Sequence, residues 1–210
     1  MDTSFISKAL AGQHLNWNRS TACSRDAFRR LVATRMSPLF FFLDFVIYPP
    51  LILYFLIVGF SARSLELFVQ SLAALFLALL TWSLAEYLVH RFVLHHVPLF
   101  ETMHNAHHHA PRALIGTPTL LSLAVFMGLA YWPLLEILGR QISSACMAGL
   151  LGGYLAYIVA HYAIHHWGSS GNGWAKALKR HHGLHHHQNG NINFGVTNRL
   201  WDRIFRTLAV

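Results

Sequence analysis

Long apolar stretches alternate with short polar ones along most of the chain. Four of them, residues 38–60, 65–89, 114–138 and 142–164, are long enough to cross a bilayer, which takes about 20 mostly apolar residues in a helix. The pattern therefore predicts four transmembrane helices. The polar pieces "SARS" (61–64) and "GRQ" (139–141) are expected to be short turns that join them as two hairpins. Pro49 and Pro50 are expected to break or bend the first helix, because proline lacks the N–H that a helix interior uses.

The composition also favours a membrane protein. Hydrophobic residues make up 54% of the chain and charged residues 11%, whereas soluble domains carry about 25% charged residues. The net charge of +8 could suggest nucleic acid, but the basic residues lie outside the apolar stretches, so we expect a membrane and no nucleic-acid partner. Cys23 and Cys146 imply no disulfide framework.

Residues 1–37 differ from the rest of the chain. They are polar and basic and contain no apolar core ahead of a cleavage site, so no removable signal peptide is expected. We interpret residues 1–37 as a cytosolic basic N-terminal segment, and residues 38–210 as one membrane-embedded domain.

The positive charges orient the predicted helices. Residues 1–37 carry six Lys and Arg, the link after the second helix adds Arg91 and Arg112, and the tail from residue 165 adds six. The other side has only Arg63 and Arg140. Cytoplasmic loops carry the excess of Lys and Arg in membrane proteins. The 14-to-2 asymmetry therefore predicts that both termini face the cytoplasm.

Histidines gather on that same side of the membrane. Fifteen of the 16 lie at or beyond the end of the second or the fourth apolar stretch, and only His14 lies elsewhere. The fifteen are His90, His95, His96, His104, His107, His108, His109, His161, His165, His166, His181, His182, His185, His186 and His187. Segments far apart in the sequence are thus expected to bring imidazoles to one membrane face.

The spacing of these histidines fits chelation. Residues three and four positions apart are neighbours on a helix, so the triplet 104, 107 and 108, the triplet 182, 185 and 186, and the pair 161 and 165 are each expected to aim at one point. His90 and His95 are five apart, so a helix end or a distortion must bring them together. The candidate metal ligands are therefore His90, His95, His104, His107, His108, His161, His165, His182, His185 and His186.

Ten imidazoles exceed the needs of one tetrahedral zinc. They predict two metal ions with about five ligands each, and imidazole suits iron, copper, zinc or nickel, whereas calcium and magnesium prefer oxygen. The other six histidines are interpreted as interfacial polar residues: His14, His96, His109, His166, His181 and His187.

Glu86 lies one helical turn before His90. Its carboxylate could accept the second N–H of that ring and fix the tautomer, as carboxylates often do behind metal ligands. The alternative is a carboxylate at the membrane interface that only reaches water. The sequence leaves both interpretations open.

Four segments resemble the fatty acid hydroxylase superfamily: "EYLVHRFVLH" (86–95), "HNAHH" (104–108), "HYAIHH" (161–166) and "LKRHHGLHHHQNGNINFGVTNRLWDRIFRT" (178–207). Within it they are most similar to the fatty acid 2-hydroxylase branch, whose histidine boxes read HX4H, HX2HH, HX3HH and HX2HH and whose tail contains the "FGVT…LWD…F" pattern. Asn193 stands where a glycine often precedes "FGVT". The resemblance covers roughly residues 38–207.

This resemblance implies an all-α integral membrane fold, in which four transmembrane helices carry a cytosolic helical cap with a dinuclear metal centre. It implies that the same ten histidines are the ligands of two iron ions, which zinc can replace during purification. It also implies hydroxylation of a long-chain fatty acyl lipid at C2 with O2 as cosubstrate, because an unactivated C–H bond requires cofactor chemistry.

The reaction needs electrons from outside the chain. Neither a glycine-rich dinucleotide fingerprint nor a haem-attachment motif is present, and residues 1–37 are too short for a haem-binding domain. We therefore expect a separate reductase with a cytochrome b5-like or ferredoxin-like carrier.

Several alternatives use similar histidines. The sequence does not distinguish a lipid hydroxylase from a lipid desaturase with the same metal centre. Sterol desaturases and methyl-sterol oxidases usually have HX3H in the first box, and carotenoid hydroxylases an Asp where this chain has Tyr162, so both fit less well. A membrane metal transporter or haem relay would place its ligands inside the spans, whose middles lack histidine here.

Overall fold

The computed structural model describes residues 35–61, 64–168, 173–188 and 190–209. Most of the N-terminal segment, together with His14, Cys23 and Arg63, lies outside the described residues. Within those ranges all regular structure is helical. The helices are α2 (Pro38–Gly59), α3 (Leu65–Leu88), η1 (Val89–Leu94), α4 (Pro98–His109), α5 (Thr119–Val125), η2 (Phe126–Tyr131), α6 (Trp132–His166), α7 (Gly173–His187) and α8 (Leu200–Ile204).

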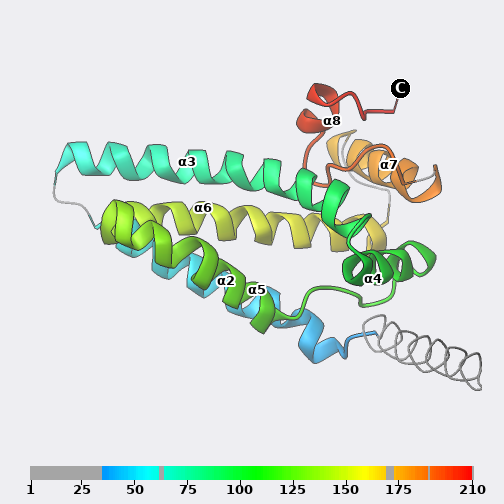
Figure 1. The fold of residues 1–210 in the computed structure, drawn as a ribbon, viewed down its shortest axis with the longest axis horizontal. Helices are drawn as coiled ribbons and strands as arrows, with labels where there is room; N and C mark the ends of the chain where they lie inside the picture. Colours follow the sequence, from blue (N-terminus) through cyan, green and yellow to red (C-terminus); the bar gives the residue numbers. More distant parts are fainter. Residues whose placement is uncertain (1–34, 62–63, 169–172, 189, 210) are drawn as a thin grey trace, which may run out of the picture.

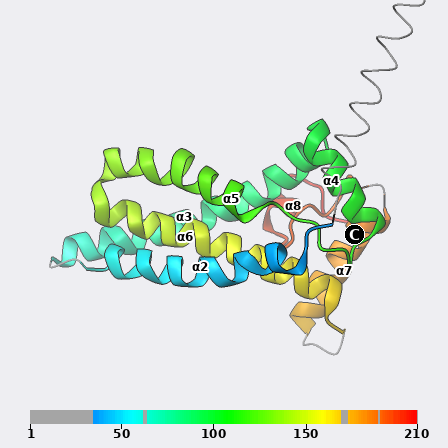
Figure 2. The same ribbon diagram turned by 90° about the horizontal axis from the view of Figure 1, so that it is seen from below.

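Three continuous helical stretches are long and apolar enough to cross a membrane: Pro38–Gly59, Leu65–Leu94 and Thr119–His166. The third has 48 residues and contains one non-helical residue, Gly139, with φ 70° and ψ 171°. The chain reverses there, so the part before Gly139 lies antiparallel to the part after it (Figures 1 and 2). The predicted "GRQ" turn is therefore confined to a single residue.

The first long helix, α2, is not broken by its prolines. It runs without interruption from Pro38 to Gly59 with Pro49 and Pro50 inside it, so the expected break at this point is wrong. In an apolar environment the rest of the backbone has no other hydrogen-bonding partners, and transmembrane helices therefore tolerate proline better than helices in water do.

Helix α6 lies at the centre of the bundle and packs against both α2 and α3. Glycine allows the close approach to α3: a Cβ atom at Gly149 would lie 2.5 Å from the carbonyl oxygen of Leu75, and one at Gly153 would meet Trp82. Small residues four apart are a frequent device for packing membrane helices. This contact fixes the position of α6, which carries one pair of the candidate ligands.

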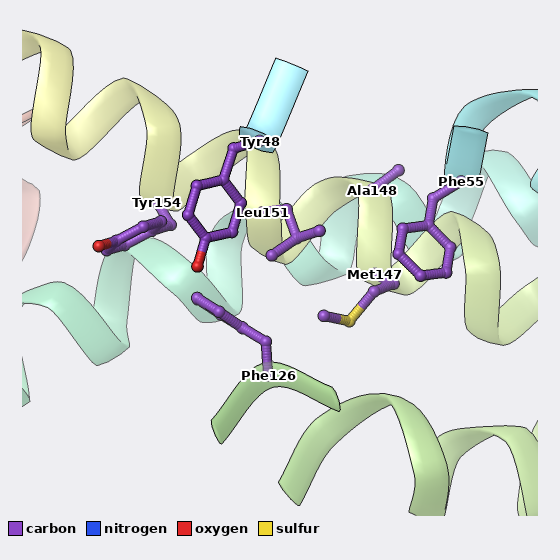
Figure 3. Close-up of a cluster of buried hydrophobic side chains, with 7 residues drawn as sticks. All are labelled: Tyr48, Phe55, Phe126, Met147, Ala148, Leu151 and Tyr154. Atoms are coloured by element: carbon purple, nitrogen blue, oxygen red, sulfur yellow. The ribbon is translucent and has the colours of Figure 1, made fainter. Parts of the chain in front are cut away.

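The core of the bundle lies where α2, η2 and α6 meet. It contains Tyr48, Phe55, Phe126, Met147, Ala148, Leu151 and Tyr154, which point toward one another in Figure 3. The outer faces are apolar too, since Phe76 is 62% and Leu129 78% exposed. Exposed apolar surface of this extent fits contact with lipid, as the composition predicted.

One end of the bundle carries the remaining helices. The last turns of α3 and α6 reach this end, where they meet α4, α7 and α8 (Figure 1). At the opposite end, the Nε2 amide of Gln141 donates to Oγ of Ser61 at 3.2 Å, which ties the two turns together. Short helices thus cover one end of the bundle, and the histidines lie at this covered end.

Candidate metal centre

All ten predicted ligand histidines come together at the covered end of the bundle. They form two groups of five, and within each group one ring nitrogen per residue lies within 4.8 Å of all the others. The first histidine group is His90, His95, His104, His108 and His185. The second histidine group is His107, His161, His165, His182 and His186.

The Nε2 atoms of each group converge on one point. In the first histidine group, Nε2 of His104 lies 3.0 Å from Nε2 of His90, 3.1 Å from that of His95 and 3.0 Å from that of His108. In the second, Nε2 of His161 lies 3.0 Å from Nε2 of His107 and 3.2 Å from that of His165. Ligands held about 2.1 Å from one ion at right angles lie about 3.0 Å apart, so both groups have the spacing of a metal site.

A π-helical turn brings the first pair together. The segment η1 (Val89–Leu94) is a π-helix, and His95 is its C-terminal cap. A π-helix pairs residue i with i+5, so the separation that does not fit an α-helix fits this turn. The rings of His90 and His95 lie nearly parallel, with centroids 5.4 Å apart. The distortion that the sequence required is therefore confirmed.

The two histidine triplets are divided between the groups. On α4, His104 and His108 belong to the first histidine group and His107 to the second. On α7, His182 and His186 belong to the second and His185 to the first. The expectation that each triplet aims at one point is therefore wrong, because each triplet contains two adjacent positions, and adjacent side chains leave a helix about 100° apart. Helices α4 and α7 instead join the two groups.

The clustered histidines have lowered pKa values, and a neutral ring is what metal binding requires. Burial is the main cause that lowers the pKa of His107 and of His185 to about 3 and that of His95 to about 4, and nearby imidazoles contribute to the lowering. Burial also lowers the pKa of His104 and of His182. A neutral imidazole has a free lone pair for a metal ion, so these rings are suited to coordination at neutral pH.

Two ligand candidates are oriented by backbone carbonyls. Nδ1 of His90 donates to the carbonyl oxygen of Phe194 at 2.6 Å, and Nδ1 of His185 donates to that of Ile192 at 2.8 Å. A proton on Nδ1 leaves Nε2 as the ligand atom. The segment after α7 therefore fixes the tautomer of one ring on η1 and one on α7.

Glu86 does not take the role considered for it. His90 donates to Phe194 instead, and the Glu86 carboxylate accepts from the backbone N of Val196 at 2.6 Å, and from N and Oγ1 of Thr197 at 2.9 and 2.7 Å. The alternative of a carboxylate that reaches water is also wrong, since Glu86 is only 4% exposed. Glu86 therefore attaches the C-terminal segment at Val196 and Thr197 to α3.

His181 is not an interfacial residue as expected. It is 4% exposed and its Nε2 lies 3.1 Å from Oδ2 of the fully buried Asp202. Asp202 also accepts from the backbone N of Phe194 and of Gly195, both at 2.8 Å. Sequence reasoning missed Asp202, whose only signal was its place in the quoted "LWD". Of the other histidines assigned to the interface, His96, His109 and His187 are exposed and His166 is half-buried.

A cavity of about 120 Å³ adjoins the second histidine group. His107, His161 and His165 line it together with His104 of the first histidine group, and Phe41, Ile115 and Ile158 are among its apolar residues. A largely apolar space beside a set of ligand nitrogens has the character of a binding site for an apolar molecule.

Known proteins are similar to this chain in sequence. Residues 75–207 match the fatty acid hydroxylase family. The human fatty acid 2-hydroxylase is 35% identical over 140 residues, which cover 61% of this chain and 37% of the human protein. A dihydroceramide fatty acyl 2-hydroxylase of Arabidopsis thaliana is 33% identical over 144 residues, which cover 61% of this chain and 57% of that protein. The chain thus spans less than two thirds of the length of these relatives.

The fold is also known from a solved structure. It is described as full-length scs7p with only the hydroxylase domain visible, and it superposes with a TM-score of 0.71 at 24% identity, over 85% of this chain and 69% of the other. The match to the family spans most of the described helices and all ten clustered histidines, from His90 to His186. The chain belongs to the fatty acid hydroxylase family.

Proposed function

We propose that this chain is the membrane-embedded part of an enzyme that hydroxylates a long-chain fatty acyl lipid at C2, with O2 as cosubstrate. The observation that carries the proposal is the meeting of two five-histidine groups beside an apolar cavity. The names of the relatives, which are 2-hydroxylases of fatty acids and of ceramide acyl chains, support the position of the reaction.

The ten clustered histidines are proposed to bind two iron ions, one in each group. The donor set supports this assignment, since imidazole nitrogen suits iron as well as zinc and the Nε2 atoms have ligand spacing. Bound iron would supply the activation of O2 that an unactivated C–H bond requires. The residues of the chain would keep the imidazoles neutral, orient them and exclude water from them.

The cavity is proposed to receive the first carbons of the acyl chain. Its apolar residues, such as Phe41 and Ile158, match methylene groups, and the reacting carbon would lie at its border near His107 and His161. A chain that extends from the bilayer would reach this border without leaving an apolar environment. Selectivity for a carbon near the headgroup would then follow from the depth of the cavity.

The proposed topology has four membrane crossings. The two antiparallel parts of the stretch Thr119–His166 would each cross once, because 48 helical residues extend over about 72 Å, more than twice the hydrocarbon thickness. The distribution of Lys and Arg supports a cytoplasmic location for both termini and the histidine groups. Residues 1–37 would form a cytosolic segment, and electrons would come from a separate reductase with a cytochrome b5-like or ferredoxin-like carrier.

Lipid analysis tests the proposed reaction. The chain would be expressed in cells that lack 2-hydroxylated lipids, and the acyl chains would be released and analysed by mass spectrometry. We expect a gain of one oxygen at C2 that becomes heavy when the cells grow under ¹⁸O2. A product that has lost two hydrogens without gaining oxygen would identify a desaturase instead, and unchanged lipids with an intact metal content would contradict the proposed substrate.

A further inference from the structure

The two histidine groups differ in what lies behind their rings. In the first histidine group, the Nδ1 atoms of His90 and His185 donate to backbone carbonyls at 2.6 and 2.8 Å. In the second, the Nδ1 atoms of His107, His182 and His186 are buried and have no hydrogen-bond partner among the described residues. The two groups therefore have the same number of rings, but only the first has backbone acceptors for the Nδ1 protons of two of its rings.

This difference bears on metal affinity. A neutral histidine that binds through Nε2 carries its proton on Nδ1. An acceptor for that proton fixes the ring and makes Nε2 more basic, and loss of such an acceptor commonly lowers metal affinity by roughly 10- to 100-fold. A buried N–H without an acceptor is unfavourable in its own right. In the first group, two rings thus have an acceptor that orients the ring and makes Nε2 more basic, and their buried N–H groups are paired.

The two supporting carbonyls belong to one short segment that is held in an unusual conformation. Asn193, between Ile192 and Phe194, has a left-handed φ of 56°, which few residues other than glycine and asparagine adopt readily. Its side chain donates from Nδ2 to the carbonyl oxygen of His181 at 3.1 Å and accepts at Oδ1 from the backbone N of Ala209 at 2.7 Å. The left-handed residue allows the carbonyls on both sides of it to reach histidines of different helices.

Asp202 holds this segment from the other side. Its carboxylate accepts four hydrogen bonds: from the backbone N of Phe194 and Gly195 at 2.8 Å each, from Oγ1 of Thr207 at 2.7 Å and from Nε2 of His181 at 3.1 Å. Asp202 is fully buried, and it contacts none of the ten clustered histidines through these bonds. Its hydrogen bonds reach the metal site through Phe194, whose carbonyl oxygen accepts from His90, and its charge also acts on His185 of the same group.

We infer that the two metal positions are unequal, that the first histidine group retains its ion more strongly, and that Asp202 is the positioning residue that maintains the difference. The inference rests on the proposed two-ion centre. It adds that the ions leave in a fixed order, the one at the second group first. The carboxylate acts by keeping the carbonyl of Phe194 on His90, and the carbonyl of Ile192 on His185.

The order of release can be measured on the purified full chain in detergent, loaded with Co²⁺. A chelator is added, and the remaining metal and the visible absorption of bound Co²⁺ are followed with time. We expect two phases whose rates differ by roughly 10- to 100-fold. His165→Ala should remove the fast phase and keep the slow one, whereas His95→Ala should remove the slow one. Release of both ions in one phase, or the reverse assignment, would overturn the inference.

Asp202→Asn tests the positioning role. The substitution keeps the size of the side chain and places an amide where carboxylate oxygens accept from backbone N–H groups. The slow phase should become faster and its absorption band should shift, while the fast phase stays as in the parent chain. Thr207→Val removes one of the four bonds and should act in the same direction but less strongly, which covers the case in which Asp202→Asn does not fold.

A matched control is Asp44→Asn. Asp44 is also buried, and it accepts from the hydroxyl of Tyr154 at 2.7 Å, away from the C-terminal segment. Because Asp44 also lines the cavity beside the second histidine group, the comparison is made on the slow phase, which its substitution should leave unchanged. If Asp44→Asn and Asp202→Asn alter the slow phase equally, the positioning role is refuted. A parent chain that binds fewer than two ions would refute the centre itself, whereas ordered release without any hydroxylated product would count against the proposed reaction alone.

Discussion

His108 and His186 stack face to face, with ring centroids 4.2 Å apart and 16° between the ring planes, although they belong to different histidine groups. The pair joins α4 to α7 at the boundary between the groups. Because each of these helices supplies residues to both groups, a movement of either helix would change both sets of ligands together. The centre therefore depends on the packing of the cap as much as on any single ring.

Removal of one ligand should affect one ion before the other. In His107→Ala the second histidine group keeps four rings and the first keeps five, so we expect about one transition-metal ion per chain instead of two and no detectable hydroxylation. His109→Ala is the control, since His109 is exposed at the end of α4. Metal analysis beside lipid analysis measures both effects. Full metal content and full activity in His107→Ala would mean that the ligand assignment is wrong.

Both termini should be accessible from the cytoplasm. Tags at the two ends of the chain should be protected in intact cells and labelled after permeabilisation. A cysteine placed at Arg140, beside the reversal at Gly139, should instead react with a membrane-impermeant reagent from outside. The expectation follows from the 14-to-2 distribution of Lys and Arg. Labelling of a terminus from outside would reverse the topology.

Glu86→Gln should destabilise the chain. The amide has one acceptor oxygen where the carboxylate uses two for Val196 and Thr197, and an unpaired buried group costs about 1–3 kcal/mol. Thermal unfolding in detergent should show a lower midpoint and easier proteolysis of the C-terminal segment. Glu66→Gln, on the exposed start of the same helix, should leave both unchanged. Equal effects of the two substitutions would argue against the attachment at Glu86.

Acid should destabilise the metal-free chain. The pKa of His107 and of His185 is lowered from 6.5 to about 3 by burial. The unfolded chain binds protons on these residues below pH 6.5 and the folded chain does not, so stability is complete above pH 6.5 and decreases as the pH falls toward 3. After treatment with a chelator, the unfolding midpoint should be lower at pH 5 than at pH 7.5. A midpoint that rises on acidification would show that these rings accept protons in the folded chain.

The sequence predicted those features that depend on local periodicity. Apolar length located the long helices, and the five-residue separation of His90 and His95 required a distortion, which is the π-helical turn η1. The division of the triplets on α4 and α7 depends on where the opposing helices lie, and periodicity does not contain that information. Periodicity also does not reveal the partners of Glu86 and Asp202. Glu86 accepts from Val196, 110 residues away in the chain, and Asp202 accepts from Phe194, 8 residues away.

The π-helical turn at Val89–Leu94 also limits how this part of the chain can change in length. Each residue added to or removed from an α-helix rotates everything beyond it by about 100°. Here the wider turn already accommodates one residue more than an α-helix would between the two rings. Deletion of Phe92 or Val93 would restore ordinary winding and leave His95, and with it α4, near its place. Insertion of a residue would instead rotate His95 away from His90, so the chain between these two rings should tolerate shortening by one residue better than lengthening.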